Sequence, residues 1–408
     1  MRVIFFSNMC SNKMFDVINK IKTKDKLNPS QKFFDLLFRG LVQNSNISEL
    51  IQITSIPVAQ SNCKKRWFGQ KKEKLNEKYT IYYPGFINIT LIKNILVMLN
   101  SLKMAKRILK SNKIRKETYI ICDPLVYDVS LSGLLISKLL KIKSVGILTD
   151  VPKYMAEIEK SKITVILKIK TLIKRKVIDM LMLGFDGYVF LTKDMNSLCN
   201  KYNKPYIILE GLVDKHEPIT FNSFNKYRKK SKVVIYAGGL HKKFGIETLI
   251  NAAKLLVDNN IEIHLYGEGD YIEELIQENS LPSNVRYFGL VNVEEIIQKE
   301  AIADLLINTR PTNEEYTKYS FPSKTMEYMS TGTPVLTTKL PGIPKDYYPY
   351  LNFIQNETSE GIANAIQDVL NRHEEVLRKQ GDEARNFVIN KKNNVIQANM
   401  LYEMLNKL

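Results

Sequence analysis

Short runs of β-branched and aromatic residues alternate with helical patterns between residues 233 and 338, and this alternation restricts the fold more than any other feature of the chain. Each run is continuously apolar, which is typical of strands that are buried on both faces. Strand–helix–strand repetition of this kind indicates a parallel, doubly wound α/β sheet with right-handed crossovers. The expected strands are Val233–Ala237, Ile261–Tyr266, Val285–Phe288, Asp304–Asn308 and Pro334–Thr337.

The first half of the chain repeats the theme less regularly. Its expected helices are Gln31–Val42, Ile92–Leu109 and Val129–Leu140, and its expected strands are Val3–Phe6, Thr80–Tyr83, Tyr119–Cys122, Ser144–Leu148, Gly187–Leu191 and Tyr206–Leu209. Residues 213–232 lack apolar periodicity, so we expect a linker there. The length of 408 residues allows two or three domains.

We therefore predict the α/β class, with two Rossmann-like domains that face a cleft. The first is expected to span residues 1–212 and the second residues 213–388, and a C-terminal helix at about 389–408 can pack back on the first. In open α/β sheets, ligands bind beyond the carboxyl ends of the strands, so both domains should present those ends to the cleft.

The net charge of +18 is concentrated in the first half of the chain. Residues 1–200 hold 35 Lys and Arg against 15 Asp and Glu, whereas residues 201–408 hold 25 against 27. This asymmetry favours a polyanionic partner for the first half, either a nucleic acid or anionic lipid headgroups. Within Lys162–Leu183, apolar residues alternate with cations that include Lys168, Lys174 and Arg175. That segment is expected either to lie on a membrane or to be a core helix with a solvated basic face.

Four cysteines lie far apart, without metal-ligand or CxxC spacing, and are expected to be reduced thiols. Lysine interrupts every long apolar stretch, and the run at the amino terminus is too short for a signal peptide. The expected location is therefore the cytoplasm, or the inner surface of the plasma membrane. Residues 1–200 contain no histidine, and no metal motif or nucleic-acid-binding module is found, so neither a metal nor a nucleic acid is expected.

Two loops carry residues suited to phosphate chemistry. The first, Gly238–Lys243, has two glycines and two lysines between a strand and a helix, which suits a diphosphate, although a plain strand–helix turn would also need glycine. It matches neither the G-x-G-x-x-G nor the Walker A pattern. Gly267-Glu268-Gly269 follows the next strand and gives a weaker signal of the same kind.

The second loop, Arg310–Pro334, packs many charged and polar residues after a strand, and a solvated loop is the less favoured interpretation. A helix that begins at Ser323-Lys324 can offer backbone N–H groups and an ammonium to phosphate oxygens. Glu327, one turn further on, can accept hydrogen bonds from a vicinal diol such as ribose.

Several of these segments resemble the family 4 glycosyltransferases, which are retaining enzymes of the GT-B fold, and most of all the bacterial members that build exopolysaccharide or capsule. The resemblance rests on Tyr236-Ala-Gly-Gly-Leu, Gly267-Glu-Gly-Asp, Tyr287-Phe-Gly-Leu-Val and the run from Lys318 to Val335, which reads KYSFPSKTMEYMSTGTPV. In the first half, only the layout and Asn28-Pro-Ser-Gln-Lys-Phe are similar.

The resemblance implies roles for individual residues. Glu327 is implied to bind the ribose hydroxyls of a nucleotide sugar, for which a uridine diphosphate sugar is the expected donor and no cofactor is needed. Catalytic roles are expected for Lys243, Lys324, Tyr319 and Asp150. The remaining donor-binding residues are expected to be Gly238, Gly239, Lys242, Gly267, Gly289, Leu290, Arg310, Ser320, Phe321, Pro322 and Ser323. Acceptor or membrane contacts are expected from Ser7, Asn8, Gln31 and Lys32, and from Lys168, Lys174 and Arg175.

Three departures from the family pattern stand out. Tyr319 replaces the first glutamate of the Glu-x7-Glu motif, Gly239 replaces the usual loop arginine, and Asp150 follows the strand that often carries a catalytic histidine. The lost loop charge is hypothesised to come from Lys242, Lys243, Arg310 or Lys324.

The resemblance implies transfer of a sugar, with retention, from a nucleotide donor to a glycan acceptor that is expected to be lipid-linked. Domain closure would bring the acceptor hydroxyl to the anomeric carbon, and the departing diphosphate would take the proton. Two alternatives stay open: a non-catalytic sugar-nucleotide-binding partner of another transferase, and a GT-B epimerase.

Overall fold

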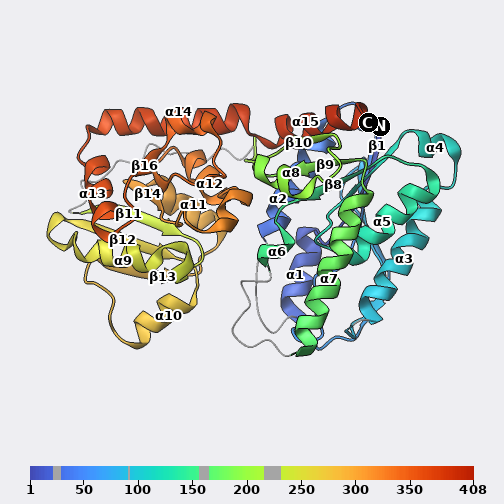
Figure 1. Ribbon diagram of the computed structural model, residues 1–408, viewed down its shortest axis with the longest axis horizontal. Helices are drawn as coiled ribbons and strands as arrows, with labels where there is room; N and C mark the ends of the chain where they lie inside the picture. Colours follow the sequence, from blue (N-terminus) through green and yellow to red (C-terminus); the bar gives the residue numbers. More distant parts are fainter. Residues whose placement is uncertain (22–28, 91, 156–164, 216–230) are drawn as a thin grey trace. The chain divides into compact units, whose positions relative to one another are not determined.

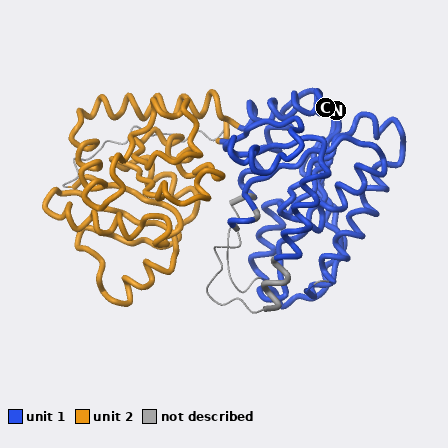
Figure 2. The backbone as a smooth tube through the Cα atoms, viewed as in Figure 1, with its two compact units in different colours: residues 1–212, 394–408 blue, residues 213–393 orange. Residues whose placement is uncertain are grey.

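The computed structural model describes residues 1–21, 29–90, 92–155, 165–215 and 231–408, and Figure 1 shows its helices and strands. The chain divides into two compact units, residues 1–212 with 394–408 and residues 213–393, which Figure 2 colours separately. The predicted linker at 213–232 lies mostly outside the described residues.

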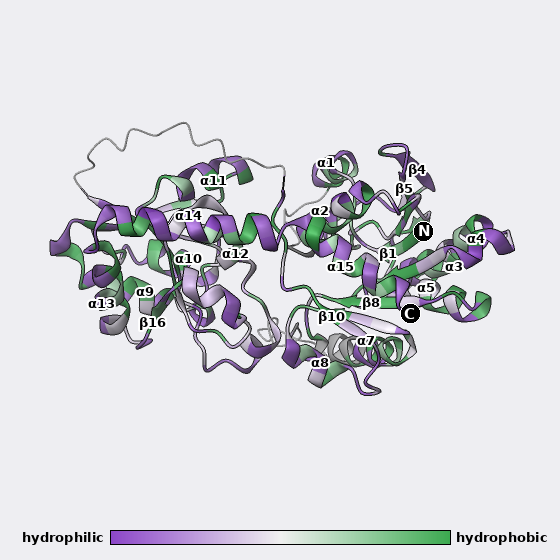
Figure 3. Ribbon diagram, turned by 90° about the horizontal axis from the view of Figure 1, so that it is seen from above, coloured by the Kyte–Doolittle hydropathy of each residue, from purple (hydrophilic) through white to green (hydrophobic). Residues whose placement is uncertain are grey.

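Unit 1 is built on an eight-stranded sheet with the strand order β10-β9-β8-β7-β1-β2-β5-β4, parallel except at β4. The strands are β1 Arg2–Ser7, β2 Glu49–Thr54, β4 Lys71–Lys74, β5 Tyr79–Tyr83, β7 Thr118–Cys122, β8 Ser144–Leu148, β9 Gly187–Phe190 and β10 Tyr206–Ile208. Strands β1 and β8 are coloured as hydrophobic in Figure 3, and they are almost entirely buried. A separate antiparallel pair joins β3 Trp67–Phe68 to β6 Phe86–Ile87.

Helices cover both faces of this sheet. Because the chain leaves β1 towards β2 but leaves β7 towards β8, right-handed crossovers place α2 on one face and α3, α5 and α7 on the other. Helix α5 packs against both α3 and α7, and α2 packs against α15. The helices are α1 Asn12–Ile21, α2 Pro29–Gln43, α3 Ile92–Ile108, α4 Asn112–Lys116, α5 Tyr127–Leu140, α6 Pro152–Met155, α7 Val165–Gly184, α8 Lys193–Cys199 and α15 Asn394–Asn406.

Helix α15 comes last in the sequence but is part of unit 1. Its buried side chains include Ala398, Leu401 and Leu405. Gly40 of α2 permits the close approach, because a Cβ atom there would overlap the carbonyl oxygen of Asn394.

Unit 2 has a six-stranded, fully parallel sheet with the order β13-β12-β11-β14-β15-β16. The strands are β11 Lys232–Ala237, β12 Ile261–Tyr266, β13 Val285–Gly289, β14 Leu305–Asn308, β15 Val335–Thr338 and β16 Asn352–Ile354. The α-helices are α9 Ile246–Lys254, α10 Asp270–Gln277, α11 Val293–Ala301, α12 Ser323–Thr331, α13 Ser359–Leu370 and α14 Glu374–Lys391. Short 3₁₀ helices span η2 Lys242–Phe244, η3 Val257–Asn259, η4 Glu315–Tyr319 and η5 Lys345–Tyr350.

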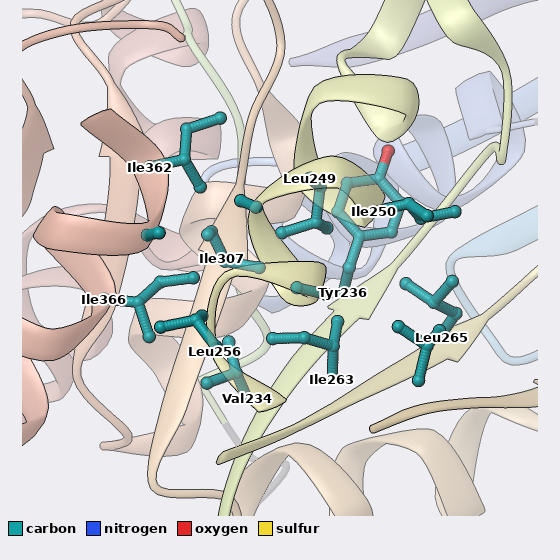
Figure 4. Packing of buried hydrophobic residues seen from close by; sticks show 14 of the residues in the cluster. Val234, Tyr236, Leu249, Ile250, Leu256, Ile263, Leu265, Ile307, Ile362 and Ile366 are labelled. Atoms are coloured by element: carbon teal, nitrogen blue, oxygen red, sulfur yellow. The ribbon is translucent and has the colours of Figure 1, made fainter. Parts of the chain in front are cut away.

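One core of unit 2 lies between the sheet and helices α9 and α13. Figure 4 shows Val234, Ile263 and Ile307 of the strands packed against Leu249 and Ile366 of those helices. Complete burial of one such aliphatic side chain contributes about 1.5–3 kcal/mol. This core fixes the positions of β11 and β14, whose carboxyl ends carry the loops described next.

Candidate functional site

The strand order of unit 2 reverses between β11 and β14, because β12 and β13 follow on one side and β15 and β16 on the other. Such a switch point is where open α/β sheets bind ligands, beyond the carboxyl ends of the strands. The loops that leave these two strands touch. Thr309 Oγ1 donates to the carbonyl oxygen of Gly245 at 3.2 Å, and a Cβ atom on Gly245, where φ is +80°, would overlap the Thr309 carbonyl oxygen.

Glycines in the loops after β11 and β12 allow backbone to pack on backbone. Gly267 has φ +128°, and a Cβ atom there would overlap the carbonyl oxygen of Gly238. The Gly238 N–H donates to the carbonyl oxygen of Tyr266 at 2.9 Å. A side chain at Gly239 would crowd the ring of Phe244. Loop packing therefore already explains why glycine stands at 267 and at 239.

The four cations that could replace a loop arginine have different surroundings. Lys242 Nζ lies 3.6 Å from Glu247 and 3.5 Å from Glu274. Burial lowers the pKa of Lys242, but the carboxylates of Glu274 and Glu247 together outweigh it and raise the pKa overall. Lys324 Nζ forms an ion pair with Glu327 Oε2 at 2.9 Å. Burial lowers the pKa of Lys324, but the carboxylates of Glu327 and Glu300 outweigh it and raise the pKa overall. Both ammonium groups are therefore already paired with carboxylates.

Arg310, directly after β14, is held differently. Its guanidinium carbon lies 5.0 Å from the ring centre of Phe244 and 5.8 Å from that of Tyr316. Its Nε atom and the hydroxyl of Tyr316 are both buried, and neither has a hydrogen-bond partner within the described residues. Buried polar atoms without partners are rare and cost about 1–3 kcal/mol each. Burial also raises the pKa of the Tyr316 hydroxyl.

Lys243 lies in the same electrostatic neighbourhood. Burial lowers the pKa of Lys243, and the positive charge of Arg310 lowers it further, while Asp270 and Glu314 oppose the effect. Asp270 is also bonded to His241 Nδ1 at 2.7 Å. Lys243 and Arg310 therefore lie close enough to interact electrostatically at the switch point.

Helix α12 is fixed to the end of β11 by one side chain. The Tyr328 hydroxyl accepts a hydrogen bond from the Ala237 N–H at 2.8 Å and donates to the Ala237 carbonyl oxygen at 3.1 Å. Because Tyr328 lies five residues after Ser323, the clamp sets the first turn of α12 relative to the glycine loop. Ser323 is exposed, and Ser320, Tyr319 and Glu327 are partly buried.

Two other predicted residues of this segment have structural contacts. Phe321 and Pro322 are buried, and the Phe321 ring packs 5.4 Å from that of Tyr347. Thr325 N–H donates to the Pro322 carbonyl oxygen at 2.9 Å. These contacts shape the turn that precedes α12.

The end of β13 carries Gly289 and Leu290, two of the predicted donor-binding residues. Gly289 has φ +69°, and its carbonyl oxygen accepts from the Gly267 N–H at 2.8 Å. Leu290 is 63% exposed. Phe288 stacks on Tyr266 with ring centres 4.8 Å apart, so an aromatic platform adjoins this edge.

In unit 1, the predicted residues after β1 form a small network. The Gln31 amide donates to the Asn8 carbonyl oxygen at 2.9 Å and accepts from the Cys10 N–H at 3.1 Å. Ser7 Oγ accepts from Gln52 Nε2 and from the Met9 N–H. Asn8 Oδ1 is buried without a hydrogen-bond partner within the described residues.

Sequence reasoning missed Asp123, which directly follows β7 at the switch point of unit 1. Its side chain is buried, and burial raises its pKa to about 7, although a hydrogen bond from the Leu125 N–H and the charge of Lys174 oppose this. The signal was a carboxylate directly after an apolar strand. Asp150, which was predicted, is partly buried and accepts from the Val151 N–H at 2.7 Å.

The remaining predicted cations lie on helices of unit 1. Lys32, Lys174 and Arg175 are exposed, and the side chain of Lys168 lies outside the described residues. No described helix is long and apolar enough to cross a membrane. In the described ranges, no group of three His, Cys, Asp or Glu side chains could hold a metal ion.

Comparison with known proteins adds a family signal over unit 2. Residues 219–387 match the model of the family described as Glycosyl transferases group 1. A search of curated protein sequences finds no match.

Solved structures resemble the whole chain. Sucrose-phosphate synthase from Thermosynechococcus elongatus aligns with a TM-score of 0.66 at 14% identity, and Anabaena HepE in complex with UDP with a TM-score of 0.65 at 14% identity. The lipopolysaccharide outer core galactosyltransferase WaaB aligns with a TM-score of 0.61 at 12% identity, and each alignment covers 100% of both chains. These likenesses confirm the predicted α/β class. The chain has the GT-B fold of these structures, and the family match over residues 219–387 supports sugar transfer.

Proposed function

We propose that this protein is a retaining glycosyltransferase that moves a sugar from a UDP-sugar to a lipid-linked glycan. The observation that carries the proposal is Arg310, a stacked guanidinium whose buried Nε has no partner within the described residues, at the switch point of a unit that matches a glycosyltransferase family. Solved structures of Anabaena HepE contain UDP and UDP-glucose, which supports a uridine nucleotide as the donor.

The diphosphate of the donor would lie between Arg310 and the first turn of α12. Free N–H groups at that helix start and the two cations at the switch point would neutralise its charge. Tyr316 would offer its hydroxyl to the same phosphates. Glu327 would accept hydrogen bonds from the ribose hydroxyls, while Lys324 holds its carboxylate in place.

The transfer step would form a bond between the acceptor oxygen and the anomeric carbon on the face from which the diphosphate departs. The bond from the anomeric carbon to the phosphate oxygen breaks, and its electron pair stays on the diphosphate. The proton of the acceptor hydroxyl moves to that departing oxygen. The protein would mainly stabilise the negative charge that develops there, and one well-placed donor of this kind can give about 10²–10³ in rate.

The acceptor would bind to unit 1, after β1 and β7, near Asn8 and Asp123. A lipid-linked acceptor fits the charge of this half, because α7 exposes Lys174 and Arg175 beside Leu172 and Ile173. On this proposal the enzyme works at the inner face of the plasma membrane, in the synthesis of exopolysaccharide or capsule.

Labelled nucleotide sugars, offered with and without membranes, test the proposal. Wild type should transfer label to a membrane acceptor, and Glu327→Ala should abolish transfer, whereas Glu383→Ala on the exposed face of α14 should not. Binding without turnover would instead indicate a non-catalytic partner, to which the tyrosine at 319 points. Conversion of free donor without an acceptor would indicate an epimerase.

A further inference from the structure

The small sheet of β3 and β6 lies at the carboxyl edge of the unit 1 sheet. Strand β6 begins at Phe86, three residues after β5 ends at Tyr83, and β5 runs parallel to β2. The loop after β2 is tied to the start of α3, because Lys93 Nζ donates to the carbonyl oxygens of Ile56 at 3.0 Å and Val58 at 2.5 Å. This edge is the one on which the proposed acceptor site lies.

We call residues 63–69 and 85–89 the Trp67 hairpin; they are an antiparallel pair of segments, with β4 and β5 between them in the sequence. The inner side of the Trp67 hairpin is well packed. Phe68 and Phe86 are paired across the strands, buried, and stacked with ring centres 4.8 Å apart. Lys93 Nζ lies 4.9 Å from the Phe86 ring centre. Asn88 Nδ2 donates to the Lys65 carbonyl oxygen at 3.2 Å. Ring stacking, a cation–π contact and a hydrogen bond therefore hold the Trp67 hairpin in one conformation.

Its outer side is apolar and exposed. Trp67 pairs with Ile87 across the strands, and the two side chains are 69% and 39% exposed. Helix α3 packs against β6, and the side chains of Ile89 and, on the first turn of α3, of Ile92 and Ile95 are exposed as well. Large exposed apolar side chains that gather on one part of a folded unit mark an interaction site.

Cations flank the same hairpin in the sequence. Lys64, Lys65 and Arg66 precede Trp67, and all three are exposed. The following edge strand β4 adds exposed Lys71, Lys72 and Lys74. Tryptophan and aliphatic side chains bordered by lysine and arginine match the boundary between anionic headgroups and acyl chains.

We propose that the Trp67 hairpin inserts into the headgroup–acyl boundary of an anionic bilayer. The four isoleucines favour a bilayer over a nucleic acid, because aliphatic side chains cannot stack on bases as aromatic rings do. The inference deepens the proposed function and rests on it, because insertion would hold the acceptor edge of unit 1 against the lipid that carries the acceptor. It assigns membrane contact to a surface distinct from α7.

The chain contains a single tryptophan, so its fluorescence reports on this hairpin alone. Phosphatidylcholine vesicles that contain phosphatidylglycerol should shift the emission to the blue, and lipids brominated on their acyl chains should quench it. Pure phosphatidylcholine should give a much smaller response. Unchanged emission from protein that co-sediments with the anionic vesicles would overturn the proposal, and so would an equal blue shift with polyphosphate in solution.

Sedimentation with vesicles supplies the second test. Each cation near the surface contributes about fivefold to partitioning, so the triple variant K64Q/K65Q/R66Q should bind about 100-fold more weakly. Trp67→Ser should weaken binding at least tenfold, because the buried area of the indole is lost. The matched triple variant R378Q/K379Q/K391Q on α14, which removes the same charge from exposed positions, should bind as wild type does.

Comparing vesicle binding with donor binding separates the two proposals. If the K64Q/K65Q/R66Q variant loses vesicle binding and transfer to vesicle-embedded acceptor but still binds UDP, both proposals stand. If it binds vesicles like wild type while Glu327→Ala abolishes transfer, the hairpin proposal alone fails. If vesicles engage Trp67 but no UDP-sugar binds, the hairpin inserts and the proposed function, with the acceptor role that rests on it, fails.

Discussion

Replacing Arg310 tests the assignment of the diphosphate site most directly. Its guanidinium stacks between Phe244 and Tyr316, and its buried Nε has no hydrogen-bond partner within the described residues. In the free protein, the contacts of the guanidinium with the two rings stabilise the fold by about 0.5–1 kcal/mol each. The unsatisfied Nε donor destabilises it by about 1–3 kcal/mol. These terms nearly cancel, so Arg310→Ala should leave the free energy of unfolding of the unliganded protein within about 1 kcal/mol of wild type.

The same substitution should be costly once the donor binds. Removal of a well-placed cationic donor should lower kcat/KM for the UDP-sugar by about 10²–10³. Arg310→Lys keeps the charge but loses the planar fork and the stacking, so an intermediate loss is expected. Steady-state transfer assays give these ratios, and thermal unfolding with and without UDP reports whether the stabilisation by ligand disappears.

Arg378→Ala serves as the matched control, because Arg378 is exposed on α14, and it should leave kcat/KM unchanged. The reasoning is refuted if Arg310→Ala keeps kcat/KM within tenfold of wild type. It is also refuted if the free protein loses several kcal/mol, because Arg310 would then be a structural residue.

Two further predictions concern groups that hold the two sites. Tyr328→Phe removes both hydrogen bonds to Ala237, so the free energy of unfolding in urea titrations should fall by about 1–3 kcal/mol and sugar transfer should also fall. If neither the free energy of unfolding nor the transfer rate changes, the clamp is unimportant. Burial raises the pKa of Asp123 from 3.8 to about 7, so the folded state favours the protonated carboxyl. The protonated carboxyl therefore contributes its full stabilisation below about pH 4, and this contribution is lost as the pH rises through 7. Asp123→Asn should therefore make the free energy of unfolding depend less on pH, and at about pH 8 the variant should be up to about 4 kcal/mol more stable than wild type. If the two curves of stability against pH run parallel, the assigned effect of burial is wrong.

Much of the fold was predictable because buried parallel strands need continuous apolar runs. The expected strand Ile261–Tyr266 coincides with β12, and Val233–Ala237 differs from β11 by one residue. Strand β2, Glu49–Thr54, was missed because Gln52 interrupts its apolar run. The structure satisfies Gln52 internally: its amide donates to Met9 and Ser7, and it accepts from Tyr79, a tertiary network that no local pattern reveals.

The site was predictable by segment but not by role. Loop chemistry placed Arg310, Lys242, Lys243 and Lys324 together as equivalent sources of charge. Only the fold shows that the four cations differ in how they are paired, because Glu247 of α9 and Glu274 of α10 form ion pairs with Lys242. Asp123 was missed because its neighbours along the chain do not show that the side chain becomes buried where the Asp123 N–H donates to the Phe6 carbonyl oxygen of β1.

Helix α15 has a consequence for the order of assembly during synthesis. Residues 213–393 form a continuous unit, so it can fold as soon as its last helix leaves the ribosome. Unit 1 emerges earlier but lacks the helix that packs against α2 until residues 394–408 have been translated. Unit 1 is therefore translated first but completes its fold last. Until α15 packs on α2, the surface of α2 that α15 covers stays open to contact with other nascent chains.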